Sequence, residues 1–307
     1  MTQPTNLPTV DSDRSASTPA GLPPVQPPSA GFILQLFVIP GVIVLIIVLV
    51  WLAFHWLAQM GSDPAALIKE MRKNNANSWQ LAHNLSEELQ QNKQSRNDPE
   101  LAKELANFLN TLLSEQLPEP GKDPRTRRDP RSEEILRRGF LCKALGELDI
   151  TDDALPVLIK AASSHKDDDE LRVRLAAMEA IALLAEKKRD TDKPVQNPQL
   201  LPLLLAASKN EDRKIATRAA MGLTALGSQD ALQRLTQMLD EPHHIDVHYN
   251  TALGLARHGK SACLETLYDM LDPQQLLAIA DEPDEQKEYK RVMILLNALR
   301  VTRQLAG

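Results

Sequence analysis

The stretch that decides the fold reads Asp-Val-His-Tyr-Asn-Thr-Ala-Leu-Gly-Leu-Ala-Arg-His-Gly, residues 246–259. Its apolar side chains recur at helical spacing, and the pair Gly254-Leu255 places a residue without a Cβ beside a large aliphatic one. A small residue on a helix face allows a neighbouring helix to approach closely. Gly259 stands where such a helix would end in a left-handed cap. The stretch therefore predicts one helix that packs tightly against others and ends near Gly259.

The same pairing of a small residue with a large one occurs three times upstream, at Ala144-Leu145, Ala180-Ile181 and Gly222-Leu223. A second helical segment follows each copy, with Leu at i and i+3: Leu155 and Leu158, Leu201 and Leu204, Leu232 and Leu235, Leu264 and Leu267. From Gly222 to Gly254 the offset is 32 residues. A period in this range is typical of solenoids built from helix pairs. Residues 187–198, rich in charge and proline, predict a loop inserted into one pair.

Helical spacing continues on both sides of these four copies. Upstream, residues 64–74, 78–91 and 99–117 predict membrane-proximal helices that form the first part of the same array, over residues 61–117. A basic, proline-rich linker is expected over 118–132, and the main array over 133–307. Residues that combine an N-cap with a following proline support these helix starts, at Asp63-Pro64, Asp98-Pro99 and Asn197-Pro198.

The last helix of the array is expected over residues 285–305. Exposed ends of repeat arrays need a capping element, because otherwise an apolar face would remain open to water. Four apolar side chains of this segment are expected to face the array, namely Val292, Leu295, Leu296 and Leu299.

The first 60 residues have a different composition. Residues 1–30 contain many Pro, Ser and Thr and few large apolar side chains, so we expect a disordered tail. Residues 31–60 predict one transmembrane helix, because Leu36 to Phe54 is an apolar run about as long as a bilayer core requires. A cleaved signal peptide or a buried core helix is the alternative. The residues expected to anchor the helix in the bilayer are Leu36, Phe37, Val42, Leu45, Leu49, Trp51 and Trp56.

The charges that flank the apolar run predict its orientation. Lys69, Arg72 and Lys73 follow it, whereas the preceding tail offers only Arg14. Because basic residues are enriched on the cytoplasmic side, we expect a single-pass protein of the inner, or cytoplasmic, membrane. Its N-terminus would lie outside and its repeat domain in the cytoplasm.

With these segments together, the chain resembles the HEAT family, in particular membrane-anchored bacterial proteins with short HEAT-like repeats of the PBS-lyase type. The resemblance covers roughly residues 133–271 and is closest over 246–259. It implies an all-α fold: an α-solenoid of HEAT-like helix pairs, preceded here by the disordered tail and the transmembrane helix. In the family an Arg usually precedes the small residue by six positions. Arg138 and Arg174 hold that position here, whereas the later copies have Ala216 and His248.

Composition excludes several function classes. The formal net charge of −6 argues against a nucleic-acid partner. Cys142 and Cys263, the two cysteines, lie far apart in apolar helical contexts, so a disulfide framework or zinc site is not expected. No glycine-rich phosphate loop and no Gly-x-Ser-x-Gly motif occurs in the sequence. We therefore expect no cofactor.

Two clusters of residues are candidates for a binding site. His244 and His248 are four residues apart, a spacing that would place both on one helical face as metal ligands. His248 also fills the Arg position of the repeat, and no His-Glu dipeptide occurs, so we expect no metal site there. The second cluster is a basic stretch that could contact anionic lipid or an acidic partner, or be a solvated linker: Lys122, Arg125, Arg127, Arg128 and Arg131.

Two functions from different classes follow. The first is a membrane-tethered, non-catalytic scaffold that presents its repeat surface to an unidentified protein. By family analogy the second helices would line that surface, with Lys160, Gln233, Arg234, Gln237, Glu265 and Asp269. The second is an enzyme, either a HEAT-like lyase or a metal-dependent hydroxylase, that uses the region from His243 to His248. A third reading is contact with lipid alone.

Overall fold

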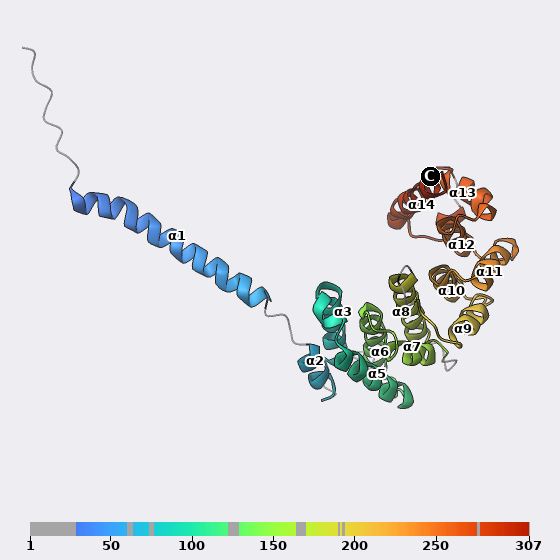
Figure 1. Ribbon diagram of the computed structural model, residues 1–307, viewed down its shortest axis with the longest axis horizontal. Helices are drawn as coiled ribbons and strands as arrows, with labels where there is room; N and C mark the ends of the chain where they lie inside the picture. Colours follow the sequence, from blue (N-terminus) through green and yellow to red (C-terminus); the bar gives the residue numbers. More distant parts are fainter. Residues whose placement is uncertain are drawn as a thin grey trace, which may run out of the picture. The chain divides into compact units, whose positions relative to one another are not determined.

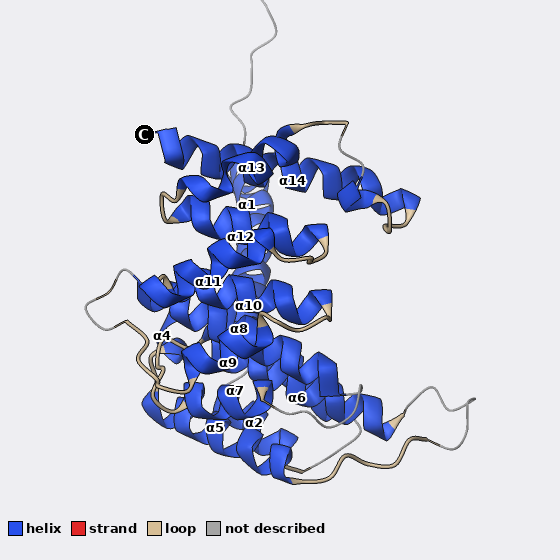
Figure 2. Cartoon of the chain, turned by 90° about the vertical axis from the view of Figure 1, so that its right-hand side faces the viewer, coloured by secondary structure: helices blue, strands red, loops and turns tan. Residues whose placement is uncertain are grey.

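The computed structural model describes residues 29–59, 64–73, 77–121, 129–163, 170–189, 191, 194–274 and 277–306. These residues form helices joined by turns and loops, and no strand occurs among them (Figure 2). The all-α prediction is confirmed. The chain divides into two units, residues 1–60 and residues 61–307. The tail predicted to be disordered lies almost wholly outside the described residues.

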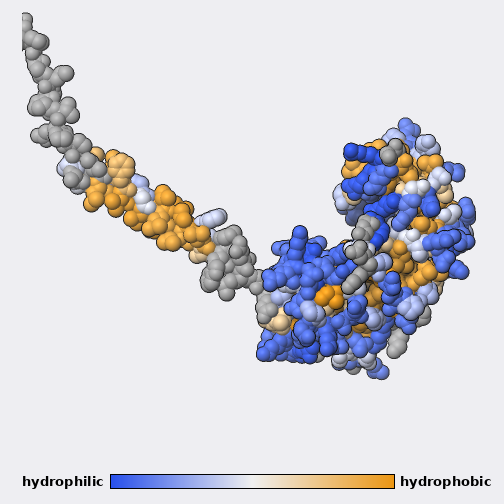
Figure 3. Space-filling model, viewed as in Figure 1, coloured by the Kyte–Doolittle hydropathy of each residue, from blue (hydrophilic) through white to orange (hydrophobic). Residues whose placement is uncertain are grey.

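Unit 1 contains a single described helix, α1 (Ala30–Gln59), with Pro40 inside it. Its stretch Leu34–Phe54 is long and apolar enough to cross a membrane, and its large side chains are exposed (Figure 3). The predicted anchors lie on this helix, and the side chain of Trp56 falls outside the described atoms; the other anchors, all exposed, are Leu36, Phe37, Val42, Leu45, Leu49 and Trp51.

Unit 2 arranges its helices in two layers. Consecutive members of the inner layer contact one another, and this layer follows the inner side of the curve that unit 2 describes (Figure 1). The inner layer is α3 (Ser78–Gln91), α6 (Pro130–Glu147), α8 (Leu171–Arg189), α10 (Arg213–Leu226), α12 (Ile245–Arg257) and α14 (Asp284–Ala306). The outer layer is α5 (Pro99–Ser114), α7 (Ala154–Ala162), α9 (Leu200–Ala207), α11 (Gln229–Asp240) and α13 (Leu264–Leu271). Shorter elements complete the unit: α2 (Pro64–Met71), α4 (Lys93–Arg96), η2 (Ser261–Cys263) and η3 (Leu277–Ile279).

Small residues set the spacing within the inner layer. A Cβ added to Gly146 of α6 would lie 2.8 Å from Cα of Ala180 in α8. The corresponding contact between α10 and α12 is made by Thr224 against Gly254. Gly227 and Gly259 follow α10 and α12 with φ of 58° and 67°, which is the left-handed conformation expected at a helix end. The role predicted for the small residues in helix packing is confirmed at Ala180 and Gly254.

Three helix ends in the inner layer are capped by a side chain from later in the chain. Arg96 Nε donates to the carbonyl of Leu89 at the end of α3 (2.6 Å), and Lys187 Nζ donates to that of Glu147 at the end of α6 (2.7 Å). His258 Nε2 lies 2.8 Å from the carbonyl oxygen of Thr224 in α10. Because the last carbonyls of a helix have no partner within it, these contacts satisfy groups that would otherwise be costly to bury. Burial lowers the pKa of Lys187, although the nearby Glu147 opposes that effect.

The structure corrects three sequence expectations. Lys187 belongs to α8 rather than to the inserted loop, which begins only after Arg189. α9 begins at Leu200, so Asn197 caps a turn, where it accepts from the Gln199 amide at 2.9 Å. In α14 the buried side chains are Ala298 and Val301, whereas three of the four side chains expected to face the array are exposed: Val292, Leu296 and Leu299.

Candidate functional site

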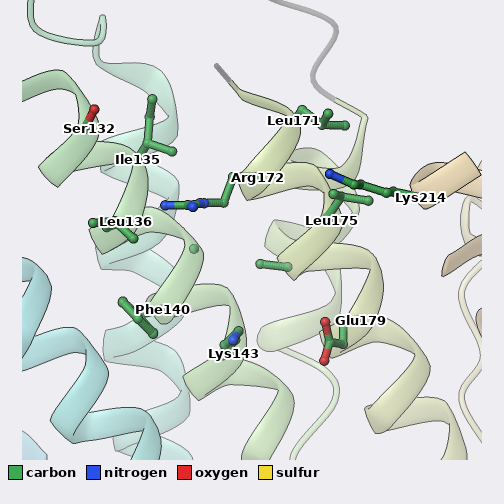
Figure 4. A pocket seen from close by; sticks show the side chains of 12 residues that line it. Ser132, Ile135, Leu136, Phe140, Lys143, Leu171, Arg172, Leu175, Glu179 and Lys214 are labelled. Atoms are coloured by element: carbon green, nitrogen blue, oxygen red, sulfur yellow. The ribbon is translucent and has the colours of Figure 1, made fainter. Parts of the chain in front are cut away.

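A hollow with a volume of about 730 Å³ lies on the inner layer, between α6 and α8. We call it the inner groove (Figure 4). Its apolar lining comes from both helices, because each turns a stripe of large side chains toward the gap left by Gly139 and Ala176. The large apolar residues are Ile135, Leu136, Phe140, Leu171 and Leu175.

Three cations surround this apolar lining. Lys143 of α6 and Arg172 of α8 come from the two walls, and Lys214 extends toward the groove from α10 (Figure 4). All three are exposed, and Lys143 lies over the Phe140 ring at 5.6 Å from its centroid. Within the described part of the chain, no ion pair engages the side chains of Arg172 or Lys214. The groove therefore combines apolar walls with three exposed cations.

The acidic residue of the groove is already engaged. Glu179 of α8 lies 3.4 Å from Arg218 of α10, so the carboxylate is shared with a cation outside the lining. Glu179 also borders a second hollow of about 380 Å³ between α8, α10, α12 and α14. The two hollows are thus adjacent along the inner layer. In the second one Arg257 of α12 lies 3.8 Å from Glu186 of α8.

The chemistry of this surface favours binding. Among the described residues that line the inner groove there is no histidine or cysteine. Pockets of this volume with mostly apolar walls and a few charged groups are typical of ligand and peptide sites. A segment with apolar side chains for the walls and carboxylates for Lys143, Arg172 and Lys214 would match the groove in both respects.

The candidate histidines lie elsewhere, at the start of α12. His244 is the N-cap of that helix rather than part of it, and its Nδ1 accepts from the Asp246 amide at 3.1 Å. His248 Nε2 lies 2.9 Å from the Glu241 carbonyl oxygen. One ring nitrogen of each residue is therefore already engaged by the backbone. No group of three or more His, Cys, Asp or Glu side chains placed to hold a metal ion occurs among the residues described.

His244 instead belongs to a polar cluster that joins α10, α12 and α14. Its Nε2 lies 3.3 Å from Arg213 Nη1 and 3.5 Å from Asp281 Oδ2. Asp246 Oδ1 accepts from Lys290 of α14 at 2.8 Å. These contacts tie the last three inner helices together, which is a structural use of the residues.

The basic stretch is only partly described. Lys122, Arg125, Arg127 and Arg128 lie outside the described residues, and Arg131 is the second residue of α6. Asp129 caps that helix and accepts from the Arg131 amide (3.3 Å), the Ser132 hydroxyl (2.6 Å) and the Gly121 amide (2.9 Å). One carboxylate therefore both caps α6 and binds the amide of Gly121.

The Asp129 carboxyl is expected to titrate with a pKa of about 2, chiefly because the Ser132 hydroxyl donates to the carboxylate. A lowered carboxyl pKa means that the cap stabilises the folded chain above pH 3.8 and is lost as the pH falls toward 2. Carboxyl carbon NMR of the full chain labelled at aspartate would measure the titration. Ser132→Ala should move the midpoint upward, and an unchanged midpoint would remove the assigned cause.

The outer-layer residues expected to display a binding surface are not on the inner layer. Arg234, one of them, is also buried, with Nε donating to Ser208 Oγ at 2.7 Å and Nη2 donating to Glu241 Oε2 at 2.6 Å. Arg234 lowers the pKa of Glu241, mainly because its guanidinium donates hydrogen bonds to that carboxylate. The other members are exposed: Lys160, Gln233, Gln237, Glu265 and Asp269.

Sequence reasoning missed the cations of the inner groove. It assigned the binding surface to the second helix of each pair, whereas the inner side of unit 2 is formed by the first helices (Figure 1). A usable signal was present, because Lys143 and Arg172 stand on helices whose other faces are apolar and small.

Comparison with known proteins gives no relative for this chain: no family model, no curated protein and no solved structure matches it.

Proposed function

We propose that this chain is a membrane-tethered, non-catalytic scaffold that binds another protein along the inner layer of unit 2. In this proposal unit 2 is an α-solenoid of HEAT-like repeats, and α1 anchors it in the inner membrane. The positive flank at Lys69, Arg72 and Lys73 supports a cytoplasmic repeat domain. The observation that carries the proposal is the inner groove, with its apolar walls and three cations.

The chemistry of the groove indicates what kind of partner it takes. Apolar walls contribute affinity when they exclude water, and cations at the rim select carboxylates and speed encounter. The partner segment should therefore alternate or mix large apolar residues with Asp or Glu. Tethering would raise the local concentration of the scaffold at the bilayer, so a modest affinity would suffice.

A photo-crosslinking amino acid at Leu136, in the wall of the groove, tests this in the full chain in its native membrane. We expect a specific protein adduct from Leu136 and none from Gln233, an exposed position on α11. Combining Arg172→Glu with Lys214→Glu should reduce the adduct about tenfold, because two attractive charges become repulsive. That reduction corresponds to roughly 1.4 kcal/mol.

The matched control is Lys209→Glu, which reverses an exposed charge away from the groove and should leave the adduct unchanged. An adduct from Leu136 that survives the double reversal, or one that Lys209→Glu removes equally, would show that the groove cations do not select the partner. Adducts at Gln233 alone would place the binding surface on the outer layer.

A further inference from the structure

The last helix presents an apolar stripe on the side that faces away from the array. Tyr289 is 71% exposed, Leu299 56%, Leu296 50%, Val292 43% and Met293 38%. Their spacing places all five on one face of α14. The opposite face carries Ala298 and Val301, which are buried against α12 and its neighbours. Orange surface is visible at this end of unit 2 in Figure 3.

Such a stripe is unusual on an exposed helix face, because an open apolar face invites association. The stripe here is continuous over about three turns and has no described side chain packed over it. A covering surface is therefore expected, and charges at the two ends of the stripe indicate which one.

Acidic residues stand at the start of the stripe and basic residues at its end. Glu285 and Glu288 precede Tyr289, whereas Arg300 and Arg303 follow Leu299, and all four charged residues are exposed. Residue 294 is the midpoint of four pairs along the helix: Tyr289 and Leu299, Val292 and Leu296, Glu285 and Arg303, Glu288 and Arg300. The stripe is thus complementary to itself when one copy is reversed.

We propose that two copies of this chain dock through α14, with the two helices antiparallel and a two-fold axis near residue 294. Each apolar side chain then meets another apolar one, and each glutamate faces an arginine. A two-fold interface uses the same patch on both copies, which the midpoint symmetry satisfies. A parallel pair would place Glu285 beside Glu285 and Arg303 beside Arg303 of the other copy, and like charges in contact are unfavourable.

The size of the patch sets the expected strength. Five apolar side chains per copy form a contact smaller than a standard stable interface, so the dimer should be weak and should dissociate on dilution. The proposal does not depend on the inner groove, because α14 contributes its outward face here. Partner binding and dimer formation can fail independently.

Cysteine crosslinking of the full chain in detergent tests the arrangement. The native Cys142 and Cys263 are buried and should not interfere. Mixing Tyr289→Cys with Leu299→Cys should give a disulfide between the two variants under mild oxidation. Tyr289→Cys alone should give none. In the antiparallel dimer the two copies of residue 289 lie ten residues apart along the helix axis, which is about 15 Å. That distance is too great for a disulfide. Crosslinking of Tyr289→Cys to itself, or no crosslink in the mixture, would overturn the proposal.

Charge exchange provides a second readout, with sedimentation of the same full chain over a concentration series. Glu285→Arg should weaken the dimer at least several-fold, and adding Arg303→Glu in the same chain should restore it. Leu296→Asp should give monomer at every concentration. Tyr268→Ser, which changes a 72% exposed aromatic residue on α13, is the matched control and should change nothing. Circular dichroism checks that each variant keeps its helices. A parent chain that remains monomeric at high concentration would contradict the proposal.

Discussion

Replacing Gly146 by alanine is expected to lower the free energy of unfolding by about 2 kcal/mol, although alanine normally favours a helix over glycine by about 1 kcal/mol. The added Cβ would lie 2.8 Å from Cα and from Cβ of Ala180. Both atoms belong to the α8 backbone or are fixed to it, so no side-chain rotation relieves the overlap. The two inner helices must separate, and the contacts around them loosen. Urea denaturation of the full chain in detergent, followed by circular dichroism, measures the change.

The matched control is Gly139→Ala, two turns earlier on the same helix and also opposite α8. Its nearest neighbour would be Ala176 Cβ at 3.9 Å, an ordinary contact. Here the helix propensity of alanine should prevail, and stability should stay level or rise. If Gly139→Ala lowered the denaturation midpoint as much as Gly146→Ala does, the close contact at Gly146 would not be the cause of the destabilisation.

Glu134→Gln is expected to cost about 3 kcal/mol or more, because it removes the carboxylate shared by two buried arginines. Arg138 Nε donates to Glu134 Oε1 at 2.8 Å, and Arg137 pairs with Oε2 of the same carboxylate. Arg137 is 6% exposed and Arg138 is 3% exposed, so water cannot solvate their guanidinium groups once the carboxylate is removed. Arg138 also donates to the Glu115 carbonyl at 3.2 Å, so the network joins α6 to the segment after α5.

The same denaturation measurement applies, with Glu133→Gln as the control. Glu133 is adjacent in sequence and more exposed, and its replacement should stay within about 0.5 kcal/mol. Glu134→Leu, which strands the same arginines beside an apolar side chain, should be at least as damaging as the glutamine. A loss below 1 kcal/mol at Glu134→Gln would mean that the arginines find other acceptors.

Much of the fold could be predicted from local patterns in the sequence. The start of α3 at Ser78 and that of α5 at Pro99 agree with the predicted bounds, and Asp98 caps α5 by accepting from two amides. These features depend on residues a few positions apart, so a single sequence contains them. The apolar run in α1 is equally local, since length and composition alone define it.

What the sequence could not supply depends on contacts between distant segments. The periodicity of α14 correctly predicted a helix, but two of its faces are apolar. The face with Ala298 is the one that packs against α12. Arg234 is buried because Ser208, 26 positions earlier, offers it a hydroxyl and a carbonyl. The inner groove likewise combines residues from α6, α8 and α10. Spacing along one helix contains none of this information.

The side chains that cap α3, α6 and α10 all come later in the chain than the helix ends they satisfy. A ribosome releases the chain from its N-terminus, so each of these ends emerges before its hydrogen-bond donor has been translated. Lys187 follows Glu147 by 40 residues, an interval of roughly 2 to 8 s at about 5–20 residues per second. Until then, water must donate the hydrogen bonds to the last carbonyls of α6. At these three helix ends, the final hydrogen bonds therefore form only after a later segment has been synthesised.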